Sequence, residues 1–158
     1  MVTKDVSFEK KVERVVQEHR ELRRMIRELQ RFLDQPQPDI NDEESHIWAG
    51  DLAERLVKLH RKLFPHFREE DRTGALEELA ERFPWVAKTA QDLQDEHDQL
   101  LGEVRAIVAA TMISAEDKVP AERDLHGRTL RLLDRLTHHE EAETDLIQKV
   151  HYEDMGGG

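Results

Sequence analysis

The chain has 158 residues, the length of one domain that can bury most of the surface its unfolded form exposes. Hydrophobic and charged residues each make up 37%, a composition typical of a helical bundle with a heavily charged exterior. The formal charge of −11 argues against a nucleic-acid partner, because phosphate binding needs a basic surface, and the absence of cysteine excludes disulfides and thiolate metal sites.

Residues that break helices divide the chain into four predicted helices. In chain order these helices span about 7–34, 43–81, 84–113 and 120–150. The last two begin at prolines, which have no N–H to lose in the first turn of a helix. Residues 151–158 are expected to form a flexible, glycine-ending tail. Because no segment alternates like a strand, the sequence predicts one all-α domain over 1–158, an antiparallel up-down-up-down four-helix bundle.

The N-terminal sequence MVTKDVSFEKK has no apolar run of the kind that a secretory signal needs. No segment approaches the roughly 20 apolar residues of a membrane-spanning helix. We therefore expect a cytoplasmic protein without a membrane contact. No feature of the sequence indicates a protein partner.

Each predicted helix carries a histidine in its apolar stripe. In the first and third helices these are His19 and His97, each within the same Glu-His-x-x-Leu phrase and flanked by aliphatic residues one turn away. In the second and fourth helices the stripe ends on a histidine and, four residues later, a glutamate: His66 and Glu70, then His139 and Glu143. Six ionisable side chains are thus predicted to face one core.

The pattern repeats, so the chain consists of two similar helical hairpins. EHREL at 18–22 corresponds to EHDQL at 96–100, and HFREE at 66–70 corresponds to HEEAE at 139–143. This correspondence favours His139 over His138, which falls off the stripe. Glu69 could replace Glu70, since a three-residue step also stays on one helix face.

Ionisable groups in a core must have partners. A buried, unpaired carboxylate costs several kcal/mol, against a total stability of only about 5–15 kcal/mol for a domain. Two divalent metal ions would offset the carboxylates and bind the imidazoles, and a mixture of nitrogen and oxygen ligands favours iron or manganese. A His and a Glu four residues apart lie on one helix face, so the Glu can bridge toward a second metal. The alternative is a polar core whose histidines are structural.

These residues, in their order and spacing, also resemble the haemerythrin-like, HHE cation-binding family over roughly residues 8–150. The resemblance implies a four-helix bundle with an oxygen-bridged di-iron centre, and functions in O₂ binding, iron or oxygen sensing, oxidative stress, and peroxide or nitric oxide handling. Carried over by position, the metal ligands would be His19, His66, Glu70, His97, His139 and Glu143.

Two departures from the O₂-carrier pattern of that family matter. The carriers have a second histidine one turn after the third-helix histidine, where this chain has Leu101. Their fourth-helix carboxylate is an Asp five residues after its histidine, whereas Glu143 follows His139 by four residues; with His138 as the ligand the spacing would be five. The site is therefore expected to be closer to the sensing and redox members than to the oxygen carriers.

The expected function is a non-haem di-iron protein that binds or reduces O₂, peroxide or nitric oxide, as a sensor, scavenger or store. Its cofactor would be two iron ions with a bridging oxide or hydroxide, and manganese or zinc would suit similar ligands. No side chain is an evident acid or base, so no catalytic residue is assigned. The alternatives are a peroxide-disproportionating enzyme and a metal-free helical interaction module.

Three residues near the stripes are not expected to bind metal. His60 lies beside the second stripe and is expected to face solvent or to lie outside the ligand shell. Glu18 and Glu96 each precede a proposed ligand, and we expect them to be solvated charges rather than hydrogen-bond partners of bound histidines.

Overall fold

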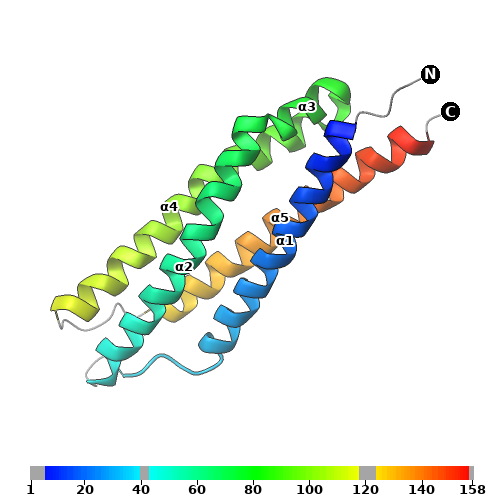
Figure 1. Cartoon of the computed structure of the whole chain (residues 1–158). Coiled ribbons are helices and arrows are strands. Elements are labelled where there is room, and N and C mark those ends of the chain that lie inside the picture. Colours follow the sequence, from blue (N-terminus) through cyan, green and yellow to red (C-terminus); the bar gives the residue numbers. More distant parts are fainter. Residues whose placement is uncertain (1–5, 40–42, 118–123, 157–158) are drawn as a thin grey trace.

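A computed structural model describes residues 6–39, 43–117 and 124–156 (Figure 1). Within these ranges all regular structure is helical, which confirms the predicted all-α class. The elements in chain order are α1 (Val6–Leu33), α2 (Glu44–Thr73), α3 (Ala75–Arg82), the 3₁₀ turn η1 (Pro84–Val86), α4 (Ala87–Asp117) and α5 (Leu125–Gly156).

The long helices α1, α2, α4 and α5 lie side by side, and α3 lies at one end of them (Figure 1). Helix α2 packs against α4, α4 packs against α5, and α1 packs against both α5 and α2. The C-terminal ends of α1 and α4 and the N-terminal ends of α2 and α5 lie at the end opposite α3 (Figure 1). The arrangement is compatible with the predicted helical bundle. In the described part of the chain, no helix combines the length and apolar character that crossing a membrane requires.

The prediction of one continuous helix over 43–81 is wrong. Helix α2 ends at Thr73, and Gly74 takes the left-handed conformation with φ 63° and ψ 31°. Its N–H donates to the carbonyl oxygen of Glu70, a helix-ending geometry that glycine adopts at the lowest steric cost. A new helix, α3, then begins at Ala75 and turns across the end of the bundle. The glycine in DRTGAL was the available signal for this break.

The predicted bounds of the later helices also need correction. Helix α4 continues to Asp117, beyond the predicted end at 113, because SAED contains no helix breaker. Residues 151–156 are helical rather than a flexible tail, because nothing in HYEDM interrupts the helix before the glycine run. The predicted start of the fourth helix at 120 lies outside the described residues, and so do residues 157–158.

A polar layer divides the interior into two apolar clusters. On α1, Val15 belongs to the smaller cluster and Leu22 to the larger one, with His19 between them. On α4, Leu93 and Leu100 lie in the two clusters on either side of the other histidine of an EHxxL phrase. The aliphatic stripes therefore fold into two cores, and the helices hold the histidines and glutamates at the level between them.

Candidate metal centre

All six predicted ligands lie in this polar layer and are buried. Their exposed fractions do not exceed 5%, a degree of burial that ionisable side chains reach only with partners. The potential ligand atoms form two groups within which all atoms lie within 4.8 Å of one another. The members are His19, His66, Glu70 and Glu143 in one group, and His97, His139 and Glu143 in the other.

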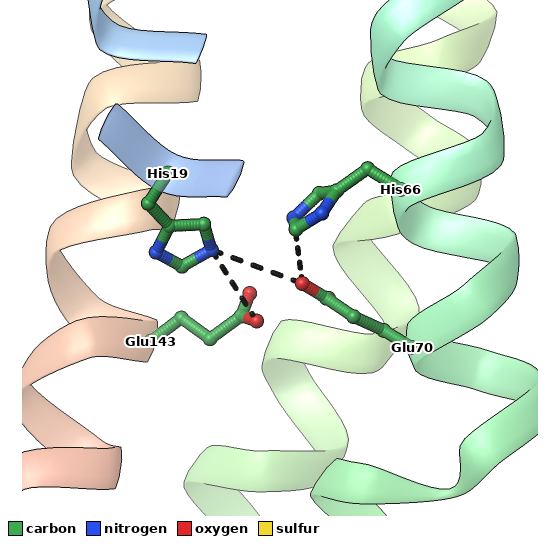
Figure 2. Close-up of side chains that lie close together, drawn as sticks. All are labelled: His19, His66, Glu70 and Glu143. Atoms are coloured by element: carbon green, nitrogen blue, oxygen red, sulfur yellow. Dashed lines mark ion pairs between the residues drawn. The ribbon is translucent and has the colours of Figure 1, made fainter. Parts of the chain in front are cut away.

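The first group defines what we call the His19 position, made by His19, His66 and the Oε1 atoms of two glutamates (Figure 2). The Nε2 atom of His19 lies 3.8 Å from Oε1 of Glu70 and 3.7 Å from Oε1 of Glu143. The Nε2 atom of His66 lies 2.6 Å from Oε1 of Glu70. Two imidazole nitrogens and two carboxylate oxygens thus converge from α1, α2 and α5.

The second group, of His97, His139 and Glu143, defines the His97 position, and Oε2 of Glu70 lies beside His97 without belonging to the group. The Nε2 atom of His97 lies 3.2 Å from Oε2 of Glu70 and 4.0 Å from Oε2 of Glu143, and that of His139 lies 3.0 Å from Oε2 of Glu143. Each carboxylate therefore faces the His19 position with one oxygen and the His97 position with the other.

The outward-facing Nδ1 atom of each of the four central histidines contacts a side chain on a neighbouring helix. These partners fix the ring orientation, and a carboxylate that accepts the Nδ1–H leaves the Nε2 lone pair free for a metal. The contacts are His19 with Thr144 Oγ1 at 3.0 Å, His66 with Glu18, His97 with Asp71 Oδ1 at 2.9 Å, and His139 with Glu96 Oε2 at 2.9 Å.

Two of these partners differ from what the sequence predicted. Glu18 and Glu96 are not merely solvated charges, because each accepts a hydrogen bond from the histidine of the following long helix. Their place directly before a core histidine in both repeats was the available signal. Asp71 and Thr144 were missed, although each directly follows one of the two central glutamates.

The alternatives to the predicted ligands lie elsewhere. His138 is exposed, whereas His139 is buried. Glu69 is paired at the surface with Arg72, at 2.7 Å. His60 is only half-buried and belongs to neither group of potential ligand atoms. The structure thus brings together the six residues that the sequence predicted, and their ligand role remains a prediction.

The charges of the centre are strongly coupled. Burial alone would lower the pKa of His19 and of His97, but the carboxylates of Glu143 and Glu70 raise both values to about 10. Burial would raise the pKa values of both glutamates, and the charge of Glu143 would raise that of Glu70 further, yet the surrounding histidines lower both pKa values, that of Glu143 to well below its usual range. Positive charge at the Nε2 atoms is therefore what the carboxylates require.

The inward-facing atoms fit divalent cations. The Nε2 atoms of all four histidines, both carboxylate oxygens of Glu70 and Oε2 of Glu143 are buried without a hydrogen-bond partner. The 2.6 Å contact between His66 and Glu70 lacks the geometry of a hydrogen bond, so it does not satisfy these atoms. Imidazole nitrogen and carboxylate oxygen are the donors that iron, manganese and zinc bind in proteins. We conclude that the donor set suits two metal ions.

A seventh ionisable residue, Glu140, is also buried in this layer. Its side chain is 3% exposed, neither oxygen has a hydrogen-bond partner, and it belongs to neither group of potential ligands. Burial raises its pKa to about 7, against the smaller opposing effect of the charges on His19 and His66. In the repeat it occupies the place of Phe67, a correspondence that could have revealed it.

Glu140 should make the metal-free protein less stable as the pH rises. Its folded-state pKa lies above the unfolded value of 4.5, so its contribution is fully present below pH 4.5 and is lost as the pH rises through about 7. Relative to metal-free wild type, Glu140→Gln should therefore gain up to about 3 kcal/mol in free energy of unfolding between pH 4.5 and 8. Denaturant unfolding at several pH values measures this gain. The exposed Glu141→Gln is the control, and a pH-independent difference would contradict the prediction.

A small apolar pocket borders Glu143 of the centre. It has a volume of about 20 Å³ and lies between α1, α3 and α5. Its lining is aliphatic apart from Lys11 and Glu143: Val12, Val15, Ala75, Leu76, Leu79 and Ile147. The volume suits a water-sized or diatomic molecule and no more.

Comparison with known proteins gives one match. The family model described as Hemerythrin HHE cation binding domain matches residues 10–150, a range that includes all six predicted ligands. No curated protein and no solved structure matches the chain.

Proposed function

The chain belongs to the hemerythrin family of HHE cation-binding domains, as its resemblance predicted, and from this premise we propose that it is an up-down-up-down bundle that holds two iron ions. The proposed role is to bind or reduce O₂, peroxide or nitric oxide, as a sensor, scavenger or store. The observation that carries the proposal is the convergence of four histidines and two glutamates, which place seven buried nitrogen and oxygen atoms without hydrogen-bond partners in one layer.

The two positions divide the ligands evenly. One metal ion would take Nε2 of His19 and of His66, and the other Nε2 of His97 and of His139. Glu70 and Glu143 would bridge the two ions, since each turns one oxygen toward each position. When bound, iron would supply the electrons and the coordination positions for a small molecule. Manganese or zinc would suit the same donors, although zinc would supply no redox chemistry.

The surroundings favour a small exogenous ligand. Leu22, Leu63, Leu100 and Leu101 are at most 2% exposed and exclude water on the side of the larger cluster. Leu101 stands where O₂ carriers have a further histidine, so neither position is supplied with a third imidazole. On the other side, an apolar pocket that borders Glu143 has room only for a small molecule. These features support a ligand of diatomic or peroxide size.

Metal content tests the proposal directly. Protein expressed in iron-supplemented medium without an affinity tag should contain close to two iron ions per chain by elemental analysis. His97→Ala should lower this content, because it removes a buried Nε2 donor, whereas His60→Ala should leave it unchanged. A content of two zinc or two manganese ions would support the two-metal site but change the chemistry expected of it. Folded, stable protein without metal would instead favour the metal-free interaction module.

A further inference from the structure

The two halves of the centre are not identical in the contacts behind their histidines. In the repeat, His19 corresponds to His97, and the residues that support them are Thr144 and Asp71. Both supporting residues directly follow a central glutamate, so they are equivalent by position as well as by contact. One is a neutral hydroxyl and the other a carboxylate.

This difference distinguishes the two metal positions. At the His97 position both imidazoles contact carboxylates, Asp71 behind His97 and Glu96 behind His139, each at 2.9 Å. At the His19 position only His66 has a carboxylate behind it, and His19 contacts the hydroxyl of Thr144 at 3.0 Å. The side chain of Asp71 is 29% exposed, and it still contacts the buried imidazole ring of His97.

The kind of supporting group affects the strength of a histidine ligand. A carboxylate that accepts Nδ1–H fixes the tautomer and the ring, and it makes Nε2 more basic; losing such a partner typically lowers metal affinity 10–100-fold. Hydrogen bonds to an ionised acceptor are also roughly twice as strong as those between neutral groups. A hydroxyl therefore orients His19 less firmly than a carboxylate orients His97.

An aromatic contact adds to the same difference. The ring of Phe67, 1% exposed, stacks on His97 with centroids 4.3 Å apart and planes within 8°. The repeat-equivalent residue on the other side is Glu140, which offers no such face. Because Glu140 is in neither ligand group, it can act on the His19 position only through space. The imidazole of His97 is thus held by a carboxylate on its edge and a phenyl ring on its face.

We propose, on the premise of the two-metal site above, that the positions have unequal affinity: the His97 position binds a divalent cation more tightly and fills first. Asp71 is the positioning residue responsible for this order, acting through the imidazole of His97. The second ion, at the His19 position, is the one that exchanges more readily.

A zinc titration of the metal-free protein tests the order of filling. Zinc is diamagnetic, so the ring signals of the four histidines can be followed by nuclear magnetic resonance as zinc is added. The first equivalent should shift the signals of His97 and His139, and the second those of His19 and His66, with dissociation constants at least 10-fold apart. Simultaneous shifts of all four histidines over both equivalents would overturn the proposal.

Variants test the role of Asp71. Asp71→Asn should weaken the first binding step 10–100-fold and leave the second largely unchanged, because it removes only the charge behind His97. Thr144→Asp should strengthen the second step. Asp98→Asn, an exposed neighbour of His97 on the same helix, is the matched control and should change neither step. An unchanged first step in Asp71→Asn, or an equal loss in both steps, would contradict the assignment.

Failure of this inference is distinguishable from failure of the proposed function. If zinc shifts no histidine signal and the purified protein contains no iron, the metal site itself is wrong. If two ions bind with equal affinity, the site stands and only the unequal affinity fails.

Discussion

Replacing Glu143 with alanine should remove both metal ions from the protein. Glu143 is 1% exposed, and its Oε1 and Oε2 atoms face the His19 and the His97 positions respectively. Removal of a residue that only supports a ligand typically lowers metal affinity by about 10–100-fold. The loss of a bridging ligand should therefore lower the affinity of both positions by more than about 100-fold. Iron per chain, measured by elemental analysis of the purified variant, should fall from about two to near zero.

Glu141→Ala is the matched control for this variant. Glu141 lies on the same helix but is exposed, so its replacement should leave the metal content unchanged. Retention of two ions in Glu143→Ala would refute the bridging role, and retention of one ion would show that Glu143 serves a single position. A circular dichroism spectrum of each variant establishes that it is folded before its metal content is compared.

Removing the metal ions from the wild-type protein should greatly reduce its stability. A ligand that binds only the native state at about 1,000 times its dissociation constant stabilises that state by about 4 kcal/mol, so two ions should contribute about 8 kcal/mol. For a chain of this size the unfolding temperature should fall by roughly 15–30 °C on chelation. Calorimetry before and after chelation measures the change. The same treatment of Glu143→Ala should have no effect, and an unchanged wild-type transition would indicate a core that satisfies itself.

The stability of the metal-free protein and the stability added by metal should change in opposite directions with pH. In the metal-free protein the raised pKa values of His19 and His97 give a contribution that is fully present below pH 6.5 and is lost as the pH rises through about 10. Metal binding requires neutral imidazoles, so protons compete less as the pH rises and affinity increases. The stability added by metal should therefore grow with pH over this range.

The positions of the six central residues were predictable because helical periodicity is a strong signal. A histidine in a stripe of leucines, such as His19, faces the core for the same reason that its neighbours do. The repeat then distinguished His139 from His138, a choice that periodicity within one short segment leaves open. The burial of both carboxylates followed from their four-residue spacing to a histidine.

The supporting residues were not predictable in the same way. Glu18 lies off the stripe of its own helix, and its role depends on where His66 of the next helix lies. Heptad spacing describes which face of a helix is buried and not how far one helix is shifted along its neighbour. The separate helix α3 was missed for a simpler reason, since the predicted helix over 43–81 ran through Gly74 although a glycine favours a helix end.

The supporting contacts form a closed cycle around the bundle, and this makes the helices dependent on one another. A residue of α1 supports the histidine of α2, and the same relation joins α2 to α4, α4 to α5, and α5 back to α1. Sliding any helix by one residue, about 1.5 Å, would pull its own histidine from its support and withdraw the support from the next histidine. A leucine core alone tolerates considerable repacking. Each such shift would instead break two supporting contacts, so the cycle favours a single alignment of all four helices.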